Sequence, residues 1–140
     1  MSINSSVAGT GVSSNASTAI LVGRVLLSIL FILSGFAKLT AISATAGWFG
    51  SIGLPLPTVA AVGSGLLEFF GGLALIVGFQ TRFFAIAIAV FTIAASLVAH
   101  TNFADQIQLL MFLKNVSITG GLLILATFGP GALSIDARRG

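Results

Sequence analysis

Four long apolar segments occupy most of the sequence and constrain its fold more than any other feature. They run from Thr18 to Leu39, Thr58 to Phe79, Phe83 to Thr101 and Ile107 to Phe128. Each is close to the roughly 20 residues that an α-helix needs to cross about 30 Å of hydrocarbon. Because four such helices and their connections use nearly all of the 140 residues, no length remains for a soluble catalytic domain.

The composition indicates a membrane protein rather than a soluble domain. Hydrophobic residues make up 56% of the chain, charged residues make up 6%, and the mean hydropathy is +1.14. A protein with a polar surface does not reach such values. A transmembrane β-barrel would need strands of alternating polarity, whereas residues 83–99 are apolar on every side. We therefore predict an all-α integral membrane protein, an antiparallel four-helix bundle.

The connection from Thr40 to Pro57 is too long for a tight turn and has a helical pattern of its own. Its apolar residues recur every three or four positions, and Trp48 among them suits the level of the lipid headgroups. Pro55 and Pro57 follow, and proline fits the first turn of a helix but not its interior. We therefore predict a short interfacial helix between the first two spans, with Trp48 as its anchor.

The two ends of the chain and the basic residues predict domain bounds and an orientation. Residues 1–17 carry no charge and few large apolar side chains, so we expect a flexible cytoplasmic tail. Residues 18–129 form a single transmembrane domain, and residues 130–140 form a short basic tail whose Arg138 and Arg139 contact anionic headgroups. The excess of Lys and Arg on the side of the termini places both in the cytoplasm of a bacterial-type cell, with the protein multi-pass in the inner membrane.

Several kinds of chemistry are excluded by residue counts. The chain has no cysteine and one histidine, so it supplies no thiolate metal site, disulfide, iron–sulfur ligation or pair of haem imidazoles. Its six basic residues are scattered and make no patch for nucleic acid. We predict no metal and no covalent cofactor. Any electron carrier, such as a quinone, would be diffusible or held by a partner.

Glu68 is the only carboxylate within the four apolar segments, near the middle of the second. Small residues flank it at helical spacing: Ala61, Ser64, Gly65, Gly71 and Gly72. A carboxylate at that depth is costly unless it is paired or protonated. At about 1.5 Å per residue, either Arg24 or Lys114 can reach it. Arg24 is favoured as a permanent partner because its planar fork suits a carboxylate, whereas Lys114 loses its proton more easily and would be the better switch.

Further polar residues complete a candidate polar site of Arg24, Lys38, Glu68, His100, Lys114 and Asn115. Lys38 ends the first apolar segment and is expected to extend into the headgroups. His100 titrates near neutral pH, so it either handles protons, binds a ligand or simply ends a helix in contact with water. Asn115 is interpreted more readily as an interhelical hydrogen-bonding residue than as a substrate contact. The pattern assigns no catalytic residue.

Between about Gly23 and Asp136, these residues belong to a longer ordered series: Arg24, Gly35 with Lys38, Gly53-Leu54-Pro55, Glu68 with Gly71 and Gly72, Gly78 with Arg82, His100, Lys114 with Asn115, Gly129-Pro130-Gly131, and Ser134-Ile135-Asp136. In this order the series resembles the DoxX family of small four-helix integral membrane proteins. The resemblance implies kinship with subunits attributed to thiosulfate:quinone oxidoreductase and with proteins of membrane-bound oxidative-stress complexes. It brings no family-wide catalytic motif.

Three functions are compatible with this pattern. The first is a membrane subunit of a redox-associated complex that binds quinone or a partner, or handles protons, around a cluster of Glu68 with Arg24 or Lys114. The second is a structural accessory subunit of a larger membrane complex, and the third is a small carrier that binds a lipid or metabolite beside Glu68. The expected partners are the bilayer and other membrane or extracytoplasmic subunits. The small-residue faces either pack against one another within one chain or join copies of it, so the sequence leaves an oligomer open. The pattern leaves enzymatic activity undecided.

Overall fold

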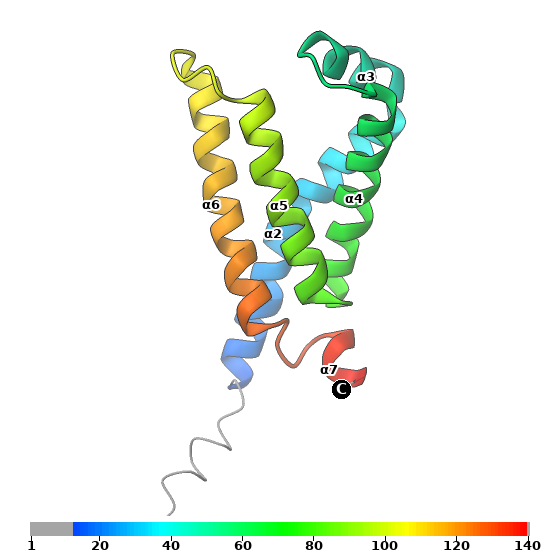
Figure 1. Ribbon diagram of the computed structural model, residues 1–140. Coiled ribbons are helices and arrows are strands. Elements are labelled where there is room, and N and C mark those ends of the chain that lie inside the picture. The colour runs from blue at the N-terminus through cyan, green and yellow to red at the C-terminus, as the bar shows by residue number, and fades with distance from the viewer. Residues whose placement is uncertain (1–12, 140) are drawn as a thin grey trace, which may run out of the picture.

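The computed structural model describes residues 13–139, and every regular element in that range is a helix. Four helices are long and apolar enough to cross a membrane: α2 (Ser14–Thr40), α4 (Pro57–Val77), α5 (Thr81–Ala99) and α6 (Gln106–Phe128). The short helix α3 (Ile42–Ser51) joins α2 to α4, and α7 (Ile135–Arg139) follows α6. The long helices run antiparallel in chain order (Figure 1), which confirms the predicted four-helix membrane bundle with a short helix after its first span.

The first helix starts earlier than the sequence pattern predicts. Residues 14–17 belong to α2 rather than to a flexible tail, because Ser13 caps the helix by accepting a hydrogen bond from the Ala16 N–H at 3.2 Å. Ser17 is already buried in the bundle. The remainder of the predicted tail, residues 1–12, lies outside the described residues.

Helices α2 and α4 approach each other through glycines. A Cβ atom on Gly35 would lie 2.7 Å from the carbonyl oxygen of Gly65 and 2.8 Å from the Cα atom of Phe69. A Cβ atom on Gly72 would lie 2.7 Å from the Ile32 side chain and 3.2 Å from the Ile32 nitrogen. Because these positions leave no room for a side chain, the two backbones come into contact and the register between the antiparallel helices is fixed.

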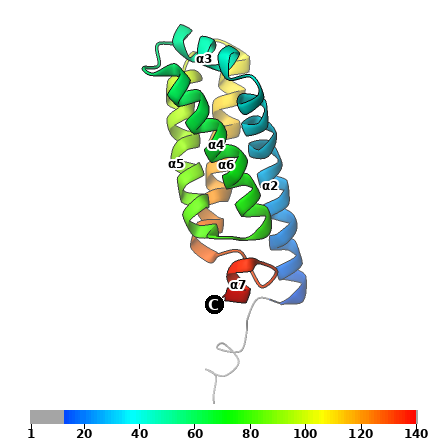
Figure 2. The same ribbon diagram turned by 90° about the vertical axis from the view of Figure 1, so that its right-hand side faces the viewer.

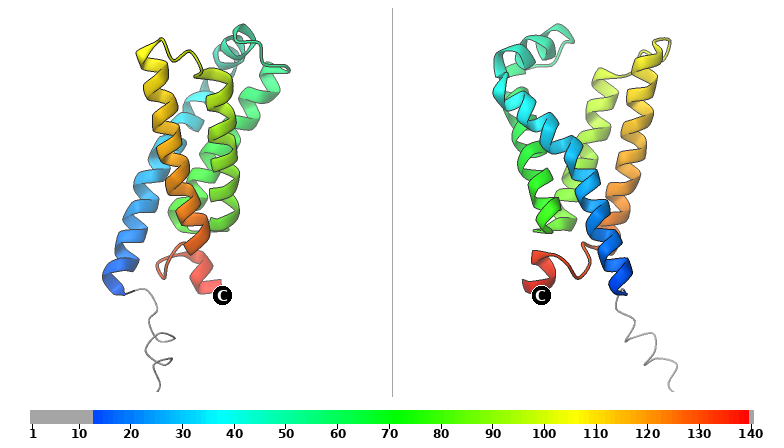
Figure 3. Two further views of the ribbon diagram at one scale, coloured as in Figure 1. Left: turned by 60° about the vertical axis from the view of Figure 1, so that its left-hand side comes forward. Right: turned by 180° about the vertical axis from the view of Figure 1, so that it is seen from behind.

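Helices α5 and α6 form the second closely packed pair. The two pairs approach each other at the α7 end of the bundle (Figure 1). The buried apolar core there contains Phe31, Leu75, Ala85, Ile88, Leu122 and Leu125. From this core the pair α2–α4 and the pair α5–α6 diverge toward the end where α3 lies (Figures 1 and 3). Figure 2 shows α3 and α7 at opposite ends of the bundle. The bundle is therefore packed at the α7 end and parted at the α3 end.

The outer surface of the bundle is apolar, as a lipid-facing surface should be. Large side chains such as Leu26, Val59, Val90 and Ile124 are exposed on the four long helices. In water such a surface would be a liability, but acyl chains solvate it without cost. The exposed apolar faces thus agree with a membrane-spanning protein.

The contact at Gly35 predicts a strong effect of a single methyl group. Gly35→Ala should lower the free energy of unfolding by about 1–3 kcal/mol, because the new Cβ atom overlaps the backbone of α4. Gly23→Ala in the same helix is the matched control, since a Cβ atom there meets nothing within 4 Å and should stabilise α2 by up to about 1 kcal/mol. Thermal unfolding of both variants in one detergent checks this, and equal shifts would contradict it.

Candidate functional site

A cavity of about 500 Å³ lies where the two helix pairs diverge, and all five helices from α2 to α6 contribute to its wall. Most of the lining is apolar, and aromatic rings contribute Phe31, Trp48, Phe49 and Phe91. The polar lining residues are Ser34, Lys38, Ser64, Glu68, Thr92, His100, Lys114 and Asn115. Five of the six residues of the candidate polar site therefore border one cavity, and Arg24 does not.

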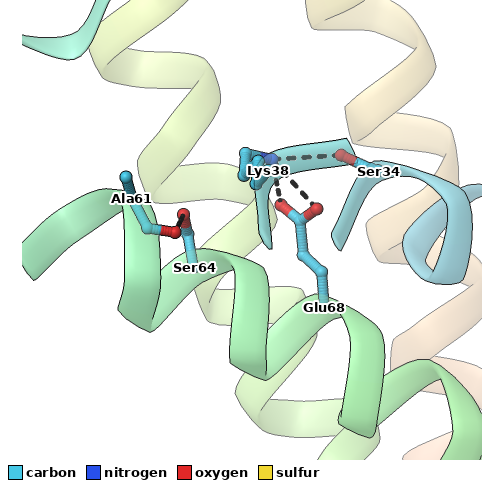
Figure 4. A network of polar contacts seen from close by, with 5 residues as sticks. All are labelled: Ser34, Lys38, Ala61, Ser64 and Glu68. Carbon is cyan, nitrogen blue, oxygen red and sulfur yellow. Dashed lines mark hydrogen bonds and ion pairs between the residues drawn. The ribbon is translucent and has the colours of Figure 1, made fainter. Parts of the chain in front are cut away.

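Glu68 is paired with Lys38, which was not the predicted partner. The Lys38 ammonium donates to Glu68 Oε1 at 2.8 Å, to Glu68 Oε2 at 2.9 Å and to the Ser34 hydroxyl at 3.0 Å. Figure 4 shows this ammonium, from α2, between Ser34 and the Glu68 carboxylate of α4. The Glu68 side chain is 5% exposed and that of Lys38 is 20% exposed. All three N–H groups of the ammonium are thus satisfied.

The prediction that Lys38 reaches the headgroups is wrong, and the helix register explains why. In the antiparallel α2–α4 pair, Gly65 lies against Leu39 and Lys38 at the end of α2. The first two turns of α4 therefore continue beyond the end of α2, and α3 packs against α4 there. Lys38 is consequently covered rather than placed at the surface of the bundle, and its charge is compensated by Glu68.

The prediction that Arg24 pairs with Glu68 is also wrong. Arg24 is fully buried near the α7 end, where its Nη2 atom donates to the Leu133 carbonyl at 2.5 Å. A Cβ atom on Gly78 would collide with this guanidinium, so Arg24 lies beside the end of α4. Gly78 is ten residues beyond Glu68, or about 15 Å along the helix. The antiparallel register thus separates the two charges.

Lys114 lines the cavity but does not pair with Glu68, so the second predicted partner is wrong as well. Its side chain is exposed, and its ammonium contacts the Met111 sulfur at 3.4 Å. It comes from α6, on the far side of the parted bundle from the α2–α4 pair that holds Glu68. Because the two helix pairs diverge, Glu68 pairs with Lys38 on the neighbouring helix α2 rather than with Lys114.

Asn115 and His100 lie on the α5–α6 side of the cavity. The Asn115 amide donates to the Ser96 hydroxyl at 2.7 Å, which is the interhelical hydrogen bond that the sequence favoured. His100 ends α5, with its backbone N–H bonded to the Ser96 carbonyl. Burial and, to a smaller extent, the positive charge of Lys114 lower the pKa of His100 below its ordinary value. The imidazole is therefore mainly neutral near pH 7.

Three hydroxyl groups in this region were not singled out in the sequence as site residues. Ser34 accepts from Lys38, Ser96 connects α5 to Asn115, and the buried Thr92 hydroxyl has no hydrogen-bond partner among the described residues. A signal for them exists, because Ser34 precedes Lys38 by four residues and Thr92, Ser96 and His100 follow at steps of four. Such spacing places polar groups on one helix face.

At the opposite end, residues 131–137 form a C-terminal clasp over the turn between α4 and α5. The Asp136 carboxylate accepts from the backbone N–H groups of Gln80 at 2.8 Å and Thr81 at 2.9 Å, which caps α5. The Asp136 N–H in turn donates to the Gly78 carbonyl at 2.9 Å. Together with the bond from Arg24 to Leu133, these contacts tie the end of the chain to three long helices.

The fold and the cavity together define a four-span membrane protein with a buried ion pair beside a mainly apolar cavity. A model of the DoxX family matches residues 19–101, which include Lys38, Glu68 and His100. The chain therefore belongs to the DoxX family, as the ordered series of residues had indicated.

Two curated proteins of Escherichia coli (strain K12) are similar to this chain. Inner membrane protein YqjF is 46% identical over 120 residues, which cover 84% of this chain and 88% of that protein. Inner membrane protein YphA is 33% identical over 124 residues, covering 85% and 89%. No solved structure matches the chain. Both relatives are named for their membrane location, in agreement with the four apolar helices of this protein.

The ion pair should respond differently to single and double substitution. Lys38→Met leaves the buried Glu68 carboxylate without its partner and should lower the free energy of unfolding by about 3 kcal/mol. The double variant Lys38→Met/Glu68→Gln removes both charges and should recover most of that loss. Thermal unfolding in detergent measures the three proteins, and a double variant that is less stable than Lys38→Met alone would contradict the pairing.

The clasp should make stability depend on acidic pH. Burial raises the pKa of Asp136, but the hydrogen bonds from Thr81 and Gln80 and the charge of Arg139 outweigh it, so the pKa lies below 3.8. A lowered carboxyl pKa stabilises the folded state fully above the unfolded-state pKa, and this stabilisation is lost as the pH falls through the folded-state value. Asp136→Asn should thus unfold at a lower temperature at pH 7, and the difference should shrink below about pH 4.

Proposed function

We propose that this protein is the membrane subunit of a redox-associated complex, in which the cavity binds a quinone and the ion pair beside it handles protons. The observation that carries the proposal is a cavity of about 500 Å³ whose walls are mainly apolar and aromatic, with a few hydrogen-bonding groups on them. That combination is typical of sites for small organic ligands. The size and the aromatic rings suit a quinone head group.

The hydrogen-bonding groups on the cavity wall favour a ligand with carbonyl oxygens. The Thr92 hydroxyl has no partner, and Ser34 accepts from Lys38 while its own proton is free of any bond among the described residues. Both groups can donate, and the two carbonyl oxygens of a quinone accept. A ligand oxygen at Thr92 would also satisfy a buried hydroxyl that is otherwise costly.

Proton handling follows from the position of Glu68. Oxidation of a quinol to a quinone breaks two O–H bonds and releases two protons and two electrons. The electrons would pass to a redox partner, since this chain contributes neither cysteine ligands nor a histidine pair. Glu68 lies on the cavity wall with its two oxygens held by Lys38, and it is the group we assign to accept one of the two protons, while the other passes to water.

The distribution of basic residues supports an orientation for this site. Arg82, Arg138 and Arg139 lie at the α7 end, whereas Lys38 and Lys114 line the cavity. By the preference of Lys and Arg for the cytoplasmic side, the α7 end and both termini face the cytoplasm. The cavity then opens toward the extracytoplasmic half of the inner membrane, where a redox partner on that side could dock.

Trp48 provides a direct test because it is the only tryptophan and lines the cavity. A short-chain quinone added to the purified protein should quench its fluorescence in a saturable way. Thr92→Val, which removes one hydrogen-bond donor, should weaken the apparent affinity roughly threefold to tenfold. Thr127→Val is the matched control, since its hydroxyl bonds to the Leu123 carbonyl of its own exposed helix face.

Two results would reject quinone binding in this cavity. One is quenching that rises linearly with quinone concentration, and the other is equal quenching in the Thr92 and Thr127 variants. The accessory-subunit alternative predicts that Glu68→Gln lowers the stability of an assembled complex without changing its turnover. The carrier alternative predicts flux across liposomes that Glu68→Gln abolishes.

A further inference from the structure

Lys114 belongs to a membrane-spanning helix, and its ammonium pairs with none of the described carboxylates. It lies eight residues after the start of α6, or about 12 Å along the helix. Its side chain is exposed on the cavity, and the contact of its ammonium is with the sulfur of Met111. An ammonium at such a depth is costly unless it meets water or an anion.

The three acidic side chains of the chain are all engaged elsewhere. Glu68 binds Lys38, and Asp105 caps α6 by accepting from the Ile107 N–H at 2.9 Å. Asp136 caps α5 at the opposite end of the bundle. The sequence contains no other Asp or Glu. None of the described carboxylates therefore compensates the charge of Lys114.

The ionisable groups that line the cavity are Lys38, Glu68, His100 and Lys114. Lys38 and Glu68 neutralise each other, so the remaining fixed charge on the cavity is that of Lys114, with His100 close enough to feel it. An anion beside both groups would gain from the ammonium and would favour the protonated imidazole. The charge distribution thus selects for a negatively charged ligand group.

An apolar surface adjoins these two groups. Ala94, Ala95 and Val98 of α5 line the cavity on the turns before His100, and Trp48 faces the cavity from α3. The small side chains leave room for a hydrocarbon chain along α5, while the polar groups lie at its end. A ligand with an acidic head and an apolar body matches both parts of this surface.

We propose that Lys114 and His100 form an oxyanion subsite on the cavity, which binds the phosphate or carboxylate head of an amphiphile whose apolar chain lies along α5. The subsite goes beyond the proposed function, because a quinone is uncharged and does not require Lys114. An oxyanion binds the Lys114 ammonium through charge-assisted hydrogen bonds. The same oxyanion can also accept a hydrogen bond from an N–H group of the His100 imidazole.

The single histidine makes this subsite measurable by nuclear magnetic resonance. Protein carrying isotope-labelled histidine in a nonionic detergent is titrated with phosphatidylglycerol, with phosphatidylcholine of the same chains, and with inorganic phosphate. We expect phosphatidylglycerol to raise the pKa of His100 in a saturable way and phosphatidylcholine to leave it unchanged, because only the former has net negative charge. Lys114→Met should weaken this response roughly tenfold or more.

Arg138→Met is the matched control, since it removes one positive charge from the exposed α7 at the other end and should leave the response unchanged. A response to phosphatidylglycerol alone supports the amphiphile, whereas an equal response to inorganic phosphate overturns the lipid-headgroup part and leaves a free-anion subsite. No response to any anion, or equal affinity in Lys114→Met, overturns the subsite. Quenching of Trp48 by quinone in Lys114→Met reports separately on the proposed function.

Discussion

The close contact between α2 and α4 is the constraint on which the candidate site depends. Where Gly35 meets Gly65 and Phe69, no side chain separates the two backbones, so the helices lie at the shortest distance and in one register. That register places Lys38 beside Glu68 and places Arg24 at the α7 end of the bundle. A shift of one helical turn would leave a lone carboxylate in a low-dielectric environment, at a cost of several kcal/mol.

The two ends of the bundle are built differently. At the α7 end, apolar packing and the C-terminal clasp join the helix pairs, with Arg24 bound to Leu133 and Asp136 bound to the start of α5. At the α3 end the pairs part around a cavity lined by aromatic and polar groups. A packed base with an open, partly polar end agrees with the ligand binding proposed above, because a ligand would enter without unpacking the core.

The sequence anticipated which polar residues lie close together better than it anticipated which of them pair. Glu68, Lys38, His100, Lys114 and Asn115 were singled out because polar groups within apolar segments are rare and costly, and all five border the cavity. The partners were wrong, because distances along the helix axis do not fix the register between helices. Thr92 and Ser96 were taken only as packing residues, although their spacing to His100 placed them on the same face.

Hydropathy alone determined that this chain is a membrane protein with four helical spans, because its apolar runs are long enough to cross a bilayer. In lipid, backbone N–H and C=O groups must be hydrogen-bonded within the protein, and an α-helix meets this requirement. The ordered residues also determined its family. Tertiary structure decided which cation meets Glu68, where the bundle opens and what the end of the chain binds. These features follow from the glycine contacts that fix how the helices pack. Such contacts depend on which helix faces meet, and the order of residues along the chain does not show which faces meet.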